Sequence, residues 1–178
     1  MKTNISLSSR RKKLLADTIR ELALQGRFYE EKEAIQHGCT TIYQHSVHVA
    51  YVSLFLMEKW QIPLDEASLV KGALLHDYFL YDWHESDASH RLHGFRHPGT
   101  ALRNAMRDYN LNQREQNMIA QHMFPLTPIP PQCREAWLVC LADKWCATEE
   151  TLRPALRSRK NPLGMLYRKL PKNPTKKR

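Results

Sequence analysis

The chain of 178 residues is long enough for one domain with a real hydrophobic core and short for two ordinary domains. No apolar run reaches the roughly 18 residues that cross a membrane, which excludes a membrane-spanning protein and predicts a cytoplasmic location. The net charge of +9 would suggest a nucleic-acid-binding protein, but the positive charge is unevenly distributed along the chain.

Most of the basic residues lie at the two ends. The first 13 residues contain five Lys or Arg, and residues 153–178 contain ten and no acid. The remainder has 12 basic and 18 acidic residues, so its net charge is negative. The C-terminal tail could bind nucleic acid or an acidic partner by counterion release. The pattern favours the alternative of a solvated terminus with one short helix around PLGMLYRKL.

The spacing of apolar residues predicts an all-α fold, because no alternating β-branched run and no Asn-Gly or Asp-Gly turn is present. Gly26 is expected to end the first helix, Asp65 to cap the fourth, and Pro98 to lie in the first turn of the fifth. The expected helices cover about residues 9–25, 29–36, 41–60, 65–77, 97–109, 112–123 and 132–150. We therefore expect a single-domain helical bundle with an N-terminal helix (1–28), a core (29–152) and a basic tail (153–178).

The stretch YDWHESDASHRLHGFRH, from Tyr81 to His97, has no consistent period and is predicted to be a loop. A loop of this length is more often functional than idle. Its histidines could line the entrance to a pocket or simply be solvated, and its aromatic residues could stack on a base or pack in the core. The residues concerned are His84, His90 and His93, with His37 from an earlier segment, and Tyr81 and Trp83.

Several expected helices place polar residues on apolar faces. Three of these residues are His45, His122 and Asp143, each with apolar neighbours three or four residues away. His76 and Asp77 follow directly on the apolar run KGALL, and His97 is expected at the N-cap of its helix. A buried charge or an unbonded imidazole is destabilising, so each of these side chains requires a partner.

Taken singly, each residue has a structural explanation, since a buried histidine usually bonds to a carbonyl and a buried aspartate usually caps a helix or pairs with arginine. Together they bring two carboxylates to the interior with too few Lys or Arg to neutralise them. A divalent cation satisfies carboxylates and neutral imidazoles together. Six nitrogen and oxygen ligands exceed what one tetrahedral ion uses, which favours a two-metal site. Such ligands suit Mn, Fe, Co, Ni or Zn better than Mg.

The pattern resembles the HD-domain metal-dependent phosphohydrolases over about residues 37–147. The stretch HSVHVA from His45 is similar to the first family motif, GALLHDYF to the His-Asp doublet and CLADKW to the closing aspartate. GFRHPGTAL at His97 and IAQHMFP at His122 resemble the motifs of the bimetal subset, which includes hydrolases of dinucleoside polyphosphates. No Gly-Tyr-Pro triplet follows, which argues against a cyclic-di-GMP phosphodiesterase of that type.

The resemblance implies one or two divalent ions. The first would be held by His45, His76, Asp77 and Asp143, and the second by Asp77, His97 and His122. It further implies hydrolysis of a phosphomonoester, phosphodiester or phosphoanhydride by a metal-activated water, with a small phosphorylated substrate such as a nucleotide or dinucleoside polyphosphate.

Two basic residues next to expected ligands are further candidates for the site. Besides Asp77 we expect Lys144 and Arg96 to act in catalysis by holding a phosphate, although both could be ordinary surface charges. The alternative to an enzyme is a regulatory or binding module that keeps the metal as a structural staple. Such a module would use its basic tail on nucleic acid or on a protein partner.

Overall fold

The computed structural model describes residues 6–32, 35–37, 40–80 and 93–152. In these ranges the chain forms six α-helices, one short 3-10 helix and a two-stranded antiparallel sheet. The elements are α1 (Ser9–Gln25), η1 (Phe28–Lys32), β1 (Ile35–His37), β2 (Thr40–Thr41), α2 (Ile42–Trp60), α3 (Glu66–Leu75), α4 (His93–Asp108), α5 (Gln113–Gln121) and α6 (Arg134–Leu152). The prediction of an all-α fold is confirmed.

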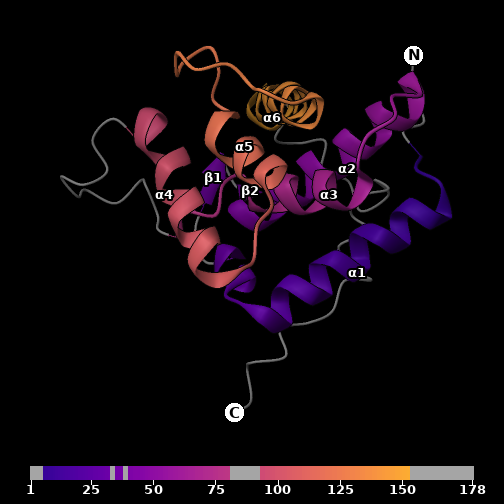
Figure 1. Cartoon of the computed structure of the whole chain (residues 1–178), viewed down its shortest axis with the longest axis horizontal. Coiled ribbons are helices and arrows are strands. Elements are labelled where there is room, and N and C mark those ends of the chain that lie inside the picture. Colours follow the sequence, from indigo (N-terminus) through magenta and orange to yellow (C-terminus); the bar gives the residue numbers. More distant parts are fainter. Residues whose placement is uncertain (1–5, 33–34, 38–39, 81–92, 153–178) are drawn as a thin grey trace.

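Helices α2 and α3 form the centre of the bundle. Helix α2 packs against α3 and α6, and α3 packs against α5 as well. In Figure 1, α1 and α6 lie on opposite sides of this central pair, and α4 lies beyond α5. The core between the helices is filled by aliphatic and aromatic side chains, among them the fully buried Leu54, Leu69, Leu74, Tyr78 and Met118. This arrangement brings α2, α3, α5 and α6 together at one place in the interior.

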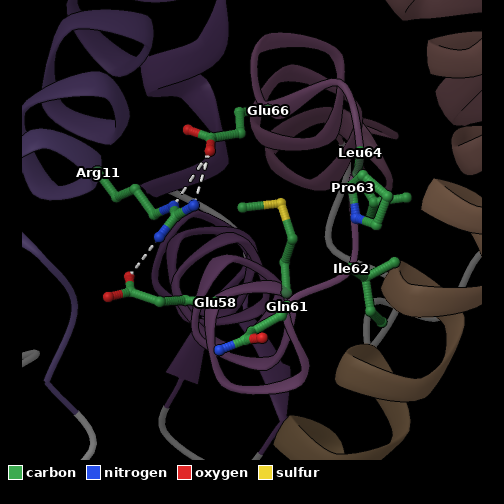
Figure 2. A pocket seen from close by; sticks show the side chains of 8 residues that line it. Arg11, Glu58, Gln61, Ile62, Pro63, Leu64 and Glu66 are labelled. Atoms are coloured by element: carbon green, nitrogen blue, oxygen red, sulfur yellow. Dashed lines mark hydrogen bonds and ion pairs between the residues drawn. The ribbon is translucent and has the colours of Figure 1, made fainter.

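Helix α1 is attached to the bundle by an apolar face and by an ion-pair cluster at its start. Its buried face carries Leu15, Ile19 and Leu22. Figure 2 shows Arg11 between two glutamates, with Nη1 lying 2.8 Å from an oxygen of Glu58 and Nη2 lying 2.8 Å from an oxygen of Glu66. A guanidinium with donors on two sides can hold two helices at once, because each carboxylate takes a separate edge. Arg11 therefore ties α1 to the end of α2 and the start of α3.

Two of the predicted helix starts are confirmed, and with one of them the predicted cap Asp65. The Thr41 hydroxyl accepts a hydrogen bond from the Gln44 amide, and the Gln44 side chain accepts one from the Thr41 amide. The Asp65 carboxylate accepts a hydrogen bond from the Ser68 amide at the start of α3. Such caps satisfy amides that have no partner inside the helix.

Two predicted boundaries are wrong. Residues 29–36 do not form one helix: η1 ends at Lys32 and Ile35 belongs to β1, where it pairs with Thr41 across the small sheet. Helix α4 begins at His93, so His97 is not an N-cap and Pro98 lies inside the helix. A proline removes one backbone donor and crowds the preceding turn, which makes an internal position costly but not forbidden.

Several predictions concern parts of the chain outside the described residues. Among them are the pocket-lining roles suggested for Tyr81, Trp83, His84 and His90, and the short helix in the tail 153–178. The side chains of His37 and His93 also lie outside the description. Within the described ranges no helix combines the length and the apolar character needed to cross a bilayer.

Gly72 of α3 lies so close to Met118 of α5 that a side chain at this position would obstruct the contact. A Cβ atom there would lie 2.4 Å from Cε and 3.1 Å from Cβ of the buried Met118. We expect Gly72→Ala to lower the free energy of unfolding by about 1–3 kcal/mol through overpacking. Urea denaturation measures this change.

The exposed Gly99 in α4 is the matched control for Gly72, because a Cβ there meets only an arginine nitrogen at 3.6 Å. Gly99→Ala should be neutral or stabilising, since alanine favours a helix more than glycine does. Equal unfolding free energies for wild type and Gly72→Ala would contradict the packing described here.

Candidate metal centre

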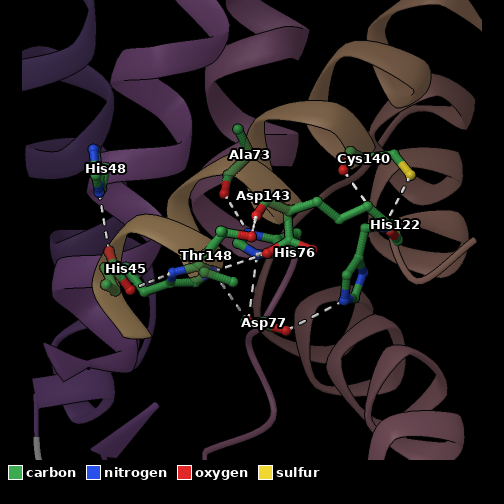
Figure 3. A network of polar contacts seen from close by, with 12 residues as sticks. His45, His48, Ala73, His76, Asp77, His122, Cys140, Asp143 and Thr148 are labelled. Atoms are coloured by element: carbon green, nitrogen blue, oxygen red, sulfur yellow. Dashed lines mark hydrogen bonds and ion pairs between the residues drawn. The ribbon is translucent and has the colours of Figure 1, made fainter. Parts of the chain in front are cut away.

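Six His and Asp side chains meet inside the bundle. His45 comes from α2 and His97 from α4, while Asp143 comes from α6. His76 and His122 occupy the C-cap positions of α3 and α5, and Asp77 follows His76 directly. All six side chains are buried, with at most 7% of each residue exposed. These are the six residues that the sequence selected as candidate ligands, and the fold brings all of them together. Figure 3 shows all of them except His97, which it does not label.

The first of two groups consists of His45, His76 and Asp143, whose possible ligand atoms all lie within 4.8 Å of one another. Nε2 of His45 lies 3.0 Å from Oδ1 of Asp143, and Nε2 of His76 lies 3.7 Å from the same oxygen. The group therefore combines two imidazole nitrogens and one carboxylate oxygen, a set that suits a divalent transition metal.

The second group consists of Asp77, His97 and His122. Oδ1 of Asp77 lies 3.1 Å from Nε2 of His97 and 3.3 Å from Nε2 of His122, and the two Nε2 atoms are 2.8 Å apart. The other oxygen of Asp77, Oδ2, lies 3.3 Å from Nε2 of His76 and 3.8 Å from Nε2 of His45. Asp77 thus faces one group with each oxygen and joins the two groups into one centre.

Hydrogen bonds at the outer edges of three imidazoles turn their Nε2 atoms inward. Nδ1 of His76 donates to the carbonyl of Ala73 at 2.8 Å, and Nδ1 of His122 donates to that of Ile119 at 2.9 Å. Nδ1 of His45 donates to Glu150 at 2.9 Å. A histidine that binds a metal through one nitrogen usually donates a hydrogen bond from the other, and this fixes the tautomer of the ring. The residues therefore fit a metal centre.

One buried nitrogen of the centre supports this fit. Nε2 of His76 is inaccessible to solvent, and its contacts with Oδ2 of Asp77 at 3.3 Å and Oδ1 of Asp143 at 3.7 Å do not have the geometry of a hydrogen bond in the described part of the chain. An imidazole nitrogen in that position is destabilising unless something else satisfies it. A cation shared with Asp143 and His45 would provide the missing partner.

The charges of the centre are strongly coupled. Burial raises the pKa of Asp77, but His76, His122 and His97 outweigh it and hold the pKa well below the usual range. Burial lowers the pKa of His45, yet the hydrogen bonds to Asp143 and Glu150 outweigh it and raise the pKa to about 9.

The pKa values of His76 and His122, the histidines at the ends of α3 and α5, are shifted in opposite directions. His76 has its pKa raised well above 6.5, because the charge of Asp77 and a bond to Asp143 overcome burial. His122 has its pKa lowered, chiefly by burial. Without metal, the first group therefore carries protons near neutral pH that a cation must displace, whereas His122 is neutral.

Two basic residues were also selected from the sequence. The Lys144 ammonium donates to the carbonyl of His122 at 2.9 Å and lies 3.3 Å from the sulfur of Cys140, so it links α6 to the end of α5. Arg96 is exposed on α4 beside His97. Lys144 therefore contacts a candidate ligand, whereas Arg96 adjoins one along the chain, and the binding of a phosphate by either residue stays a prediction.

Two glutamates near the centre were not selected from the sequence. Glu150 lies seven residues after Asp143, two turns along the same face of α6, a spacing that could have identified it. Glu31 in η1 is fully buried, and neither of its oxygens has a hydrogen-bond partner in the described ranges. Burial raises the pKa of Glu31 well above the usual value, and the charges of His76 and Asp77 also act on it. Glu31 was missed because its segment was expected to be an ordinary helix, in which a glutamate needs no special explanation.

The comparisons with known proteins place the chain in one family. The family model described as HD domain matches residues 42–148, which is more than half of the chain and spans from the start of α2 into α6. No curated protein and no solved structure shows a significant match. The HD domain is a helical fold whose members are mostly metal-dependent hydrolases, in agreement with the bundle and the buried His and Asp groups described above. The chain therefore belongs to the HD domain family.

Proposed function

We propose that the protein is a metal-dependent phosphohydrolase that acts on a nucleotide-like or other small phosphorylated substrate. The observation that supports this proposal is the position of Asp77, whose two oxygens face two separate His-containing groups. A single structural ion requires only one closed set of ligands, whereas two adjacent sets that share a carboxylate are typical of two-metal hydrolases.

In this proposal His45, His76, Asp77 and Asp143 hold one divalent ion, and Asp77, His97 and His122 hold a second. Mn, Fe, Co, Ni and Zn are the candidates, since imidazole-rich sites suit these ions better than Mg. Such ions make water a better nucleophile at neutral pH and stabilise the charge that develops on a phosphoryl group.

The residues of the chain provide binding and orientation. The backbone carbonyls of Ala73 and Ile119 hold the rings of His76 and His122 so that the Nε2 atoms stay directed at the centre. Lys144 keeps the end of α5, and with it His122, against α6. Arg96 is the candidate for binding a substrate phosphate, because it is exposed next to His97 and a guanidinium can bind two phosphate oxygens at once.

A substrate screen tests this function. Protein loaded with each candidate metal should hydrolyse at least one class among nucleotides, dinucleoside polyphosphates and aryl phosphoesters. The activity should disappear after treatment with a chelator and return on addition of metal, because the ligands remain positioned by the fold. Failure of every metal-loaded form to hydrolyse any of these compounds would rule the proposal out.

A second candidate function is a binding module that uses the basic tail. The observation in its favour is the run of ten Lys or Arg without an acid in residues 153–178. Deleting the residues after Arg153 should abolish binding to a polyanion such as heparin or RNA and leave hydrolysis unchanged, since counterion release depends on the number of basic groups. A filter-binding assay at several salt concentrations measures the loss. Unchanged binding by the truncated chain would eliminate a role for the tail.

A further inference from the structure

We propose that Glu150 is a positioning residue of the metal centre: its carboxylate orients the His45 ring toward the metal and is itself held in place by His48. The inference deepens the proposed function, because it rests on His45 being a metal ligand. It concerns residues outside both groups of candidate ligands.

The contacts of Glu150 use both of its oxygens. Oε2 accepts a hydrogen bond from Nδ1 of His45 at 2.9 Å, and Oε1 accepts one from Nδ1 of His48 at 3.0 Å. Only 9% of the Glu150 side chain is exposed and 13% of that of His48. The carboxylate is therefore held at two points in a setting largely removed from water, where hydrogen bonds to a charged group are strong.

The geometry follows from two helices that lie side by side. His45 and His48 are three residues apart on one face of α2, and Asp143 and Glu150 are seven residues apart on one face of α6. The two faces interlock, so that His45 lies between Asp143 at Nε2 and Glu150 at Nδ1. Figure 3 shows His48 on the side of His45 that faces away from His76 and Asp77.

His45 differs from the other two oriented histidines in the kind of partner that its outer nitrogen has. His76 and His122 donate to neutral backbone carbonyls, whereas His45 donates to a carboxylate. A carboxylate partner makes the imidazole a stronger electron donor to a metal, and removal of such a partner typically weakens metal binding tenfold to a hundredfold. We therefore expect Glu150 to determine how tightly the first group holds its ion.

Metal affinity is the measurement that tests this role. It is determined for Zn²⁺ and Co²⁺ by competition with a chelator over a range of pH, so that the loss of the His45 proton, whose pKa is about 9, is separated from the affinity of the deprotonated site for the ion. Glu150→Ala should bind the metal about tenfold to a hundredfold more weakly than wild type. Glu150→Gln keeps an oxygen acceptor without the charge and should lie between the two. The matched control is Glu149→Gln, because the Glu149 side chain is 41% exposed and its ion pair within the described residues is a long one, 3.9 Å to His48. It should bind as wild type does.

A purely structural role for Glu150 predicts a different result. In that case the variant would unfold at a lower temperature in the presence of chelator but would bind metal with wild-type affinity once folded. The spectrum of bound Co²⁺ gives an independent readout, because a His45 ring that is no longer held should change the visible absorption bands. Wild-type affinity and an unchanged Co²⁺ spectrum in Glu150→Ala would overturn the inference.

The variant His45→Ala separates this inference from the proposed function. If His45→Ala binds metal as wild type does, His45 is not a ligand and the proposed centre is wrong. If His45→Ala loses affinity and Glu150→Ala does not, the centre is retained and only the positioning role is discarded.

Discussion

Replacing Asp77 with alanine is expected to remove bound metal and phosphohydrolase activity together. Asp77 faces both groups, with Oδ1 lying 3.1 Å from His97 and Oδ2 lying 3.3 Å from His76, so its loss affects both proposed ions. Metal ions provide several kcal/mol of charge stabilisation in such reactions, which corresponds to a loss of rate of about a thousandfold or more. Elemental analysis of the purified variant and its rate on the substrate found in the screen measure the two effects.

The matched control is Asp17→Ala, which makes the same change on the exposed part of α1, where Asp17 pairs only with Lys13 and Arg20 in the described structure. This control should keep the metal content and the rate of wild type, because an exposed ion pair contributes little. Circular dichroism should show helices in both variants. An Asp77→Ala protein that hydrolyses substrate at the wild-type rate would show that the centre described here is not the active site.

The apparent metal affinity of the first group is expected to rise steeply with pH. Without metal, the hydrogen bonds of His45 to Asp143 and Glu150 outweigh the effect of burial and raise the pKa of His45 to about 9. The pKa of His76 is also raised, chiefly because Asp77 outweighs burial. A metal must displace these protons, so below pH 9 the His45 proton lowers the apparent affinity about tenfold for every unit by which the pH falls, and the His76 proton acts in the same direction. Between pH 8 and pH 6 the loss due to His45 should reach about a hundredfold.

The second group should respond differently, because burial lowers the pKa of His122 and leaves that ring neutral near pH 7. Its metal affinity should change little between pH 7 and pH 9. The variants His122→Ala and His45→Ala allow each group to be measured by itself. Calorimetric titrations in two buffers of different ionisation enthalpy count the protons released per ion. An affinity of the first group that does not depend on pH would contradict the charge arrangement described here.

Helices with clear end signals were predicted well from the sequence. The bounds expected for α1 and for the start of α2 agree with the structure, since Gly26 and Thr41 act locally on neighbouring backbone groups. The bounds around η1 and α4 were wrong for the opposite reason. Ile35 pairs with Thr41 in a sheet, and α4 continues through Pro98; both depend on interactions that short sequence windows do not contain.

The six candidate ligands could be selected from the sequence because a polar residue on an apolar helical face is anomalous by itself. This signal requires only the period of a helix and the free energy needed to bury an unpaired polar group. Glu150 and Glu31 were not selected by this signal. Glu150 is the last residue of the expected helix 132–150, although its spacing from Asp143 could have identified it, and Glu31 lies in a segment whose structure was assigned incorrectly.

By itself the sequence determined the helical class, most helix positions and the identity of the side chains that require a partner in the interior. Only the packing of α2, α3, α4, α5 and α6 decided that these side chains form two groups, that Asp77 joins them and that Glu150 contacts His45. The physical reason is one of range. Helix propensity and capping act over a few residues, whereas distances between ligand atoms depend on how helices far apart in the chain pack against one another.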